Sequence, residues 1–360
     1  MISAQLVKQL REMTDAGMMD CKNALVECNG DIDKAVSFLR EKGLSKAAKK
    51  ADRIAAEGVI SMKLSPDLSS GVLLEINSET DFAAKNDLFK NLVQKTTDLV
   101  FTNNIKDPEQ LDSAQIDGAK FQDFLHEQIS KIGENIKIRK IKRLDTSACS
   151  CNPPSQKILN GYIHSNNKVG VLILARFKNE QNKEKIATLV RNLCMHAAAM
   201  KPVYICHKGF SPEFIAAEKA ALKGELEKQN EENARLGKPK VVIPEYVSRA
   251  EITDEVLAKK EEELKQILRE QKKPEAIWDK ILPGQIDRFL ADNTILDSRL
   301  TLLGQFYVMD DKKTIADVLK NQSEELNDNI EILDYIRFEL GEGIEKKDED
   351  FASEVAAQIK

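Results

Sequence analysis

The chain has no apolar run of about 18 residues, the length that a membrane-spanning helix needs. It holds only six cysteines in 360 residues, which is typical of a protein whose thiols stay reduced in the cytoplasm. Its net charge is −5, whereas proteins that follow nucleic-acid phosphates usually carry a basic excess. The N-terminal segment MISAQLVKQLREM has neither a long apolar stretch nor a cleavage-like site, so we expect no secretory signal. These absences predict a cytoplasmic protein that binds neither a membrane nor nucleic acid directly.

The sequence also lacks the short motifs of common catalytic and cofactor sites, including Walker A, HExxH, GxSxG and the dinucleotide fingerprint. Cys149 and Cys151 have no second ligand pair at a matching spacing, which disfavours a zinc site. Cys194 and His196 lie two positions apart on a predicted helix and therefore point to different faces. The other histidines have no evident acidic or nucleophilic companion: His126, His164 and His207. We therefore expect a binding protein that is not an enzyme and needs no metal or cofactor of its own.

Residues 1–44 have the pattern of three short helices. Apolar residues recur at helical spacing in the second and third of them, and Asn29-Gly30 separates the two. Asp31 is a good N-cap for the third helix, and Gly43 suits its end. The Ala- and Lys-rich segment 45–57 then predicts a mobile helical linker.

A β-hairpin followed by a helix occurs twice, which predicts an α+β core with an internal duplication. Gly58 and Gly71 of the first hairpin correspond to Gly161 and Gly170 of the second, at nearly equal offsets. We expect one antiparallel-sheet-plus-helix subdomain over 58–145. The second subdomain is predicted to combine 146–207 with 286–341.

Residues 208–285 interrupt this pattern with a strongly charged insertion. In residues 259–273, ten of 15 residues are charged. The apolar seam is narrow and consists of Leu257, Leu264 and Leu268. Such a seam predicts an antiparallel coiled-coil hairpin, with Pro239 and Pro244 marking the bend between its arms. The alternative is a solvated pair of surface helices with no partner.

The segment 342–360 predicts a C-terminal helical module. Phe351, Val355 and Ile359 recur at helical spacing, and acidic residues occupy the first turn, where the helix dipole favours them. The preceding GEGIEKK is rich in glycine and charge, which suits a flexible tether. We therefore expect the apolar stripe of this helix to dock on a partner.

Phe82, in the loop SETDFAAKN after the first hairpin, belongs to neither the strand pattern before it nor the helix pattern after it. The corresponding loop of the second copy, Lys178 to Asn182, contains only polar residues. The fold therefore does not require an aromatic residue here. Two interpretations remain: a staple-like contact with its own helix, or an exposed anchor for a protein partner.

Five segments together resemble the bacterial elongation factor Ts family and occur in its order. They are MTDAGMMDCKNALVECNGDIDKAVSFLREKG, TDFAAKN, KIGENIKIRK, MHAAAMKP and YIRFELGEGIEK. TDFAAKN is similar to the family's Thr-Asp-Phe-Val-Ala-Lys signature, with Ala83 where Val is usual. The resemblance implies a ubiquitin-associated-like (UBA-like) fold for residues 1–44. The insertion is longer than in short relatives, and the sequence does not show what the extra length does.

The resemblance further implies a guanine-nucleotide exchange factor for elongation factor Tu. Asp81 and Phe82 would enter the partner's GTPase domain near its magnesium site and promote release of GDP. Of Met18 and Met19, which precede the second helix, we expect one to pack inward and the other to contact the partner. The full set of expected partner-binding residues is Thr80, Asp81, Phe82, Ala83, Met18, Met19, Phe351 and Val355.

A hypothesis from another functional class is an adaptor or scaffold. The three-helix module would then bind a helix or a ubiquitin-like surface, and the long hairpin would reach a second protein. Acceleration of GDP release from elongation factor Tu distinguishes the exchange factor from the adaptor.

Overall fold

The computed structural model describes residues 2–14, 16–147 and 156–344. The fold is α+β and divides into two compact units. Unit 1 contains Met1–Ala175, Lys183–Ala198 and Tyr335–Lys360, and unit 2 contains Arg176–Asn182 and Ala199–Asp334. None of the helices in the described ranges is long and apolar enough to cross a membrane.

Unit 1 begins with three helices around a small core of their own. They are α1 (Ala4–Thr14), α2 (Met18–Glu27) and α3 (Ile32–Ala48). Asp31 caps α3 as predicted, because its side chain accepts a hydrogen bond from the Lys34 N–H at 3.1 Å. The buried core of this three-helix module consists of Val7, Leu10, Cys21, Ala24, Leu25 and Ala35.

The predicted end of the third helix at Gly43 is wrong, since α3 continues to Ala48. A Cβ atom at Gly43 would lie 3.5 Å from the side chain of Ser130, an ordinary van der Waals distance, so α3 packs at this residue against the helix that carries Ser130. Ala47, predicted to lie in a mobile linker, is instead buried in a core of unit 1. The first part of the predicted linker therefore belongs to α3, and 49–56 is a non-helical connection.

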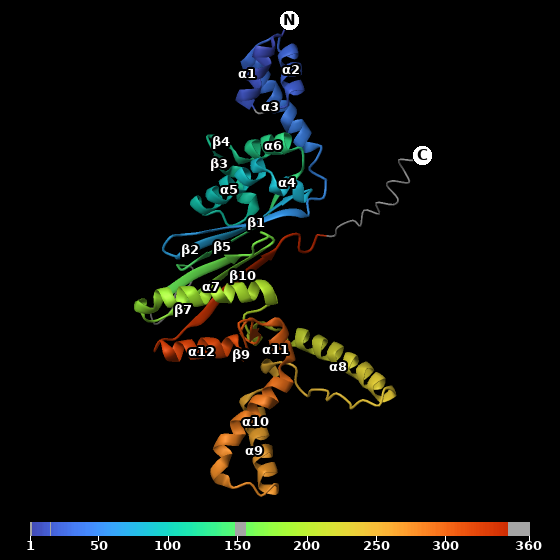
Figure 1. The fold of residues 1–360 in the computed structure, drawn as a ribbon, viewed down its shortest axis with the longest axis vertical. Helices are drawn as coiled ribbons and strands as arrows, with labels where there is room; N and C mark the ends of the chain where they lie inside the picture. Colours follow the sequence, from blue (N-terminus) through green and yellow to red (C-terminus); the bar gives the residue numbers. More distant parts are fainter. Residues whose placement is uncertain (1, 15, 148–155, 345–360) are drawn as a thin grey trace. The chain divides into compact units, whose positions relative to one another are not determined.

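The first sheet of unit 1 is antiparallel, in the order β1-β2-β5. Its strands are β1 (Glu57–Leu64), β2 (Ser70–Ser78) and β5 (Ile136–Asp145). One face is covered by α4 (Asp81–Lys85), α5 (Asp87–Thr102) and α6 (Phe121–Ile132) (Figure 1). Between α5 and α6 lie a 3-10 helix and a two-stranded ribbon: Pro108–Ser113, β3 (Gln115–Ile116) and β4 (Ala119–Lys120). Alternate residues of β2 point into the core between this sheet and its helices: Val72, Leu74 and Ile76.

A second sheet has the order β10-β7-β6. Its strands are β6 (Gln156–Ile163), β7 (Val169–Phe177) and β10 (Glu331–Glu339), and α7 (Lys183–Met200) follows β7. A Cβ atom at Gly161 would lie 2.4 Å from the sulfur of Met62, and one at Gly170 would lie 2.6 Å from a methyl carbon of Ile60. The glycines that mark the repeat in the sequence therefore allow close contact with β1 of the first sheet.

Unit 2 is mainly helical. Its elements are α8 (Pro212–Arg235), α9 (Asp254–Glu270), α10 (Trp278–Asn293), α11 (Ile295–Leu300), β8 (Phe306–Tyr307), β9 (Asp310–Thr314) and α12 (Ile315–Glu325). Ser211 caps α8 by accepting a hydrogen bond from the Phe214 N–H at 3.2 Å. One core of the unit contains Phe210, Ile215, Leu222, Val247 and Leu296.

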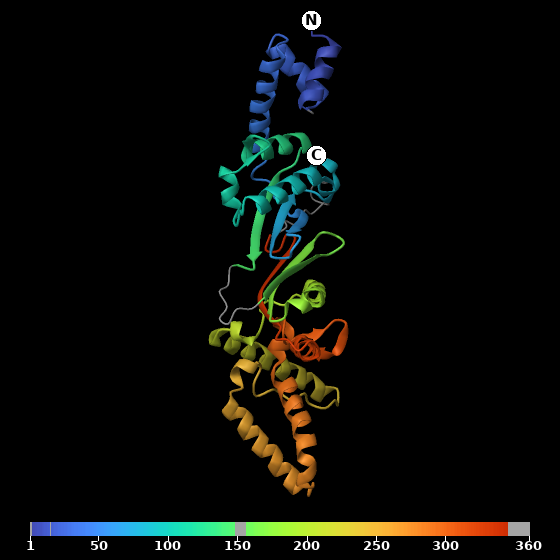
Figure 2. The same ribbon diagram turned by 90° about the vertical axis from the view of Figure 1, so that its left-hand side faces the viewer.

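The predicted bend of the helical hairpin at Pro239 and Pro244 is wrong. The hairpin forms between α9 and α10, which meet at residues 271–277 (Figure 2). Leu268 packs with Trp278 and Leu282 in a core of its own. The indole N–H of Trp278 also donates to the Lys273 carbonyl at 3.1 Å, which closes the turn. Leu268 of the predicted seam is therefore buried in the hairpin. It packs against α10, which follows it in the chain, and not against a helix that precedes it.

The end of β10 leads into a turn that is fixed to the first sheet. The Gly341 N–H donates to the buried carboxylate of Glu75 at 2.9 Å, and Arg139 donates to the Glu342 carbonyl at 2.6 Å. The start of GEGIEKK is therefore packed, contrary to the prediction of a flexible tether. The predicted C-terminal helix, with Phe351 and Val355, and the Cys149/Cys151 pair lie outside the described residues.

Candidate functional site

Phe82 lies on a short helix and not in the loop that the sequence predicted. Thr80 is the N-cap of the five-residue helix α4, and its hydroxyl accepts a hydrogen bond from the Ala83 N–H at 3.2 Å. Asn86 ends α4 and caps α5, because its N–H donates to the Ala83 carbonyl at 3.0 Å and its side chain accepts from Leu88 at 2.8 Å. The chain therefore passes from β2 to α5 through a continuous series of capped turns.

Two neighbouring residues of α4 differ sharply in their exposure to solvent. Ala83 is 7% exposed, whereas Phe82 is 80% exposed. The staple-like interpretation of Phe82 is therefore wrong, because a staple side chain would be covered by its own helix. An exposed aromatic side chain on a capped helix is a suitable anchor for a protein partner, since large rigid side chains dominate binding energy at interfaces.

Asp81 forms an ion pair within the same helix. The Lys85 ammonium donates to Oδ2 of Asp81 at 2.7 Å, and both side chains remain well exposed. This hydrogen bond, with the positive charges of Lys85 and Lys168, holds the pKa of Asp81 below its usual value. The site therefore carries an ionised carboxylate beside an exposed aromatic ring at neutral pH. Lys85 is a further residue of the site that the sequence could have indicated, because its i, i+4 spacing from Asp81 is typical of a helical ion pair.

A groove of about 670 Å³ lies beside α4. Its apolar lining includes Val59, Phe89 and Val93, and Asp81 and Lys168 are among its charged lining residues. The groove is lined by Asp81, Ala84 and Lys85 of α4, so a protein that contacts this helix has room to place side chains here.

Met18 and Met19 are 60% and 64% exposed, so the expectation that one of them packs inward is wrong. They form the first turn of α2, whose buried residues begin at Cys21. Met13, near the end of α1, is also 58% exposed. The three methionines add flexible apolar surface to the module, which suits contact with another protein.

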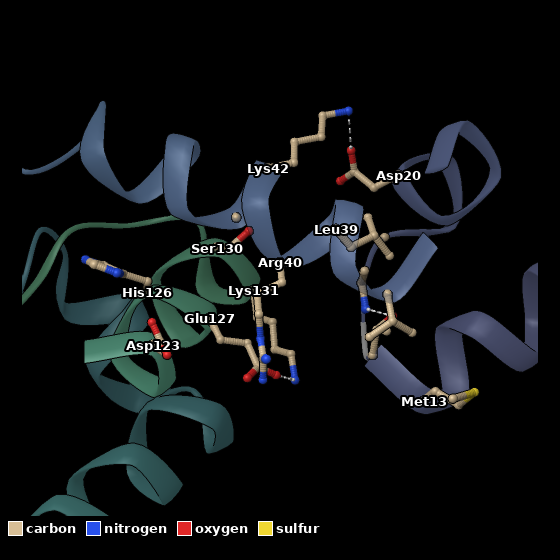
Figure 3. A pocket seen from close by; sticks show the side chains of 15 residues that line it. Met13, Asp20, Leu39, Arg40, Lys42, Asp123, His126, Glu127, Ser130 and Lys131 are labelled. Atoms are coloured by element: carbon tan, nitrogen blue, oxygen red, sulfur yellow. Dashed lines mark hydrogen bonds and ion pairs between the residues drawn. The ribbon is translucent and has the colours of Figure 1, made fainter. Parts of the chain in front are cut away.

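A cavity of about 380 Å³ lies between the three-helix module and α6 (Figure 3). Its lining is mixed in charge and includes the Asp20–Lys42 pair at 3.7 Å and the Glu127–Lys131 pair at 2.8 Å. None of its lining residues belongs to the segment 78–86. The cavity is therefore separate from the site around Phe82.

The described part of the chain has no cluster of three or more His, Cys, Asp or Glu residues that could hold a metal ion. Cys194 and His196 are both buried on α7. Burial raises the pKa of the Cys194 thiol well above its usual value, so the nucleophilic thiolate is disfavoured. The feature that distinguishes this surface is thus the exposed aromatic side chain of Phe82.

An α+β scaffold with an exposed aromatic side chain on a capped helix favours a protein-binding factor. Comparison with known proteins specifies the class: the family model described as elongation factor TS matches residues 79–244 and 240–342. Elongation factor Ts of Wolinella succinogenes is 60% identical over 358 residues, which are 99% of each chain. Elongation factor Ts of Helicobacter hepaticus is 58% identical over 359 residues, 100% of this chain and 99% of the relative.

The chain belongs to the elongation factor Ts family. Members of this family are nucleotide exchange factors of translation elongation that act on elongation factor Tu, and they are not enzymes. The match covers the whole TDFAAKN segment, residues 80–86, so the α4 site lies within the family region. Because the relatives extend over nearly the full chain, the resemblance seen in separate sequence motifs is confirmed.

Proposed function

We propose that this chain binds elongation factor Tu and promotes release of GDP from it by inserting Asp81 and Phe82 near the partner's magnesium site. The observation that carries the proposal is the 80% exposure of Phe82 on a helix capped at both ends. An anchor held in one direction loses little conformational entropy on binding, so more of its contact energy remains for displacing parts of the partner.

The proposed mechanism needs no bond-breaking step in this chain. GDP is held in such GTPases by Mg²⁺ and by a cradle of backbone N–H groups. The Phe82 ring acts as a wedge that displaces the elements holding the ion, while the Asp81 carboxylate competes for the ion's water ligands. Since the factor prefers the nucleotide-free partner, linkage requires that its binding weakens GDP binding by the same factor.

Two further segments belong to the proposed interface. The exposed Met18 and Met19 contact the partner from the three-helix module. A C-terminal helix with Phe351 and Val355 docks on the partner's GTPase domain, and its sequence pattern is the support for this part. Thr80 and Ala83 support the site indirectly, because one caps α4 and the other is buried beneath it. The factor acts in the cytoplasm and does not bind nucleic acid directly.

The proposed domain organisation follows the sequence pattern. A UBA-like module precedes two duplicated core subdomains (58–145, and 146–207 with 286–341), and the connection between the module and the first subdomain is shorter than predicted, because α3 continues to Ala48. The insertion that begins at 208 ends later than the predicted 285, because α10 continues to Asn293, and the C-terminal module (342–360) completes the organisation. Close-packed glycines at 161 and 170 support the duplication, because they correspond to the glycines of the first hairpin.

The experiment is the release of fluorescently labelled GDP from purified elongation factor Tu, followed with and without this protein. Rapid release that depends on the concentration of this protein is expected. Binding to elongation factor Tu without faster release would instead favour the adaptor function.

A further inference from the structure

Two loops of unit 1 clamp each other at the base of α4. The carboxylate of Glu134, between α6 and β5, accepts hydrogen bonds from the Thr80 N–H at 3.0 Å and from the Thr80 hydroxyl at 2.6 Å. In the opposite direction, the carboxylate of Glu79 accepts the N–H of Asn135 at 2.6 Å. Consecutive residues of each loop therefore bind consecutive residues of the other.

The clamp continues into the connection from the three-helix module. Asn135 is 2% exposed, and its side-chain amide donates to the carbonyl of Arg53 at 2.7 Å. The Arg53 guanidinium lies 3.4 Å from the Glu79 carboxylate. Each of these bonds to a carboxylate involves an ionised group, and charge-assisted hydrogen bonds are the stronger kind. The start of α4 is therefore held by the turn that leads into β5, the strand paired with β2.

Thr80 connects this clamp to the site, because it is bonded to Glu134 and also begins α4. It is the N-cap of α4, so its orientation sets the direction of the helix that carries Asp81 and Phe82. A helix of five residues has few internal hydrogen bonds and is not stable by itself. Its orientation must therefore come from tertiary contacts, and Glu134 supplies two of them to one residue.

We propose that Glu134 is a positioning residue for nucleotide exchange, acting through Thr80 to hold Phe82 in the direction that meets the partner. This inference rests on the function proposed above. Glu134 itself does not touch the nucleotide or its ion. Without the carboxylate, α4 samples several orientations, and the exposed ring reaches the partner correctly in only a fraction of encounters.

The test compares four variants of the full chain by GDP release from elongation factor Tu, with the maximal rate and the half-saturating concentration measured separately. The variants are Glu134→Ala, Phe82→Ala, the double variant, and Glu109→Ala as a control at an exposed carboxylate of the same unit. Glu134→Ala is expected to lower the maximal rate about tenfold, since a small misplacement of a positioned group is costly. Glu109→Ala should leave the rate unchanged.

The double variant separates positioning from general structural support. If Glu134 acts through Phe82, removing the carboxylate should cost much less once the ring is absent, because only the milder contribution of Asp81 is then left to lose. Hydrogen exchange should also accelerate at the amides of α4 but not in β1 or β2. If Glu134→Ala folds poorly, Glu134→Gln keeps the side-chain size and one acceptor oxygen, and about a threefold loss is expected from its half-satisfied clamp.

Different failures overturn different statements. A normal rate with Phe82→Ala overturns the proposed function and this inference together. A rate lost with Phe82→Ala but kept with Glu134→Ala overturns the inference alone. Multiplicative losses in the double variant also overturn it, because Glu134 would then act by a route that does not include the ring.

Discussion

The ammonium group of Lys85 donates to the Asp81 carboxylate at 2.7 Å, one turn earlier in α4. The same nitrogen lies 5.7 Å from the centroid of the Phe82 ring. One lysine therefore contacts both members of the proposed working pair, by an ion pair and by a cation–π contact. On binding, either contact can be exchanged for contacts with the partner, because all three side chains are accessible to solvent.

Phe82→Ala should reduce nucleotide exchange strongly without unfolding the protein. Loss of an aromatic anchor costs about 2 kcal/mol or more of binding free energy, and an 80% exposed side chain contributes little to the core. GDP release and the melting temperature should be measured on the same preparation. Val242→Ala is a matched control, since Val242 is 85% exposed but lies in unit 2. A large fall in melting temperature for Phe82→Ala would assign the ring to the fold.

Asp81→Asn should have a milder effect than Phe82→Ala, and the effect should depend on Mg²⁺. The amide is nearly isosteric with the carboxylate but has no charge with which to compete for the ion's water ligands. Exchange rates should be compared in magnesium buffer and in excess chelator. An equal loss in both conditions would contradict a role of Asp81 at the magnesium site.

The lowered pKa of Asp81 also predicts how this contribution depends on pH. A depressed carboxyl pKa means that the charged form is favoured in the folded protein, so its contribution is present above the unfolded value of 3.8. The contribution is lost only as the pH falls through the folded pKa. The ratio of wild-type to Asp81→Asn exchange rates should therefore stay constant above about pH 5. A ratio that changes near neutral pH would show that another group titrates.

Replacing Met18 and Met19 together by Ala should weaken the complex several-fold with little effect on the melting temperature. Both side chains are exposed at the start of α2, so the variant removes apolar contact surface and leaves the three-helix core intact. The dissociation rate of the complex gives the direct measurement. Val26→Ala is the control, because Val26 is 55% exposed on the same helix. Equal effects of the two variants would argue against a specific methionine contact.

The α9–α10 hairpin should be dispensable for exchange. Lys260 and Phe289 bring the two arms together, with 5.4 Å between the ammonium nitrogen and the ring centroid, so residues 261–288 can be replaced by a short Gly-Ser linker. The removed core around Leu268 and Trp278 is separate from the core of α8. Near-normal GDP release with a retained melting transition is expected. Loss of exchange in a folded variant would mean that the hairpin touches elongation factor Tu.

Deleting residues 346–360 should slow exchange and raise the dissociation rate of the complex. The cut leaves the turn at Gly341 in place, where its N–H is bonded to Glu75. The melting temperature of the free protein should therefore change little. Near-normal exchange with a clearly lower melting temperature would show that the C-terminal segment covers its own protein.

Local sequence patterns determined much of the fold, because helix periodicity, helix caps and hairpin turns depend on residues that are close together in the chain. The second and third helices of the N-terminal module were predictable from apolar spacing and the Asp31 cap, and both hairpins from strand periodicity and glycine. Phe82 was recognisable as a functional candidate because it fitted neither adjacent pattern. That deviation was visible in the sequence, although its 80% exposure was not.

Contacts between distant parts of the chain decided the rest. Helix α3 continues through Gly43 because its packing against α6 outweighs the local preference of glycine for a helix end. The hairpin pairs α9 with α10 because Trp278 and Leu282 supply the apolar surface that buries Leu268. The Thr80–Glu134 clamp joins residues 54 positions apart, so no local pattern could indicate it. The spacing of apolar residues thus determined which elements form. Tertiary packing decided where these elements end, which elements pack against each other and how α4 is held.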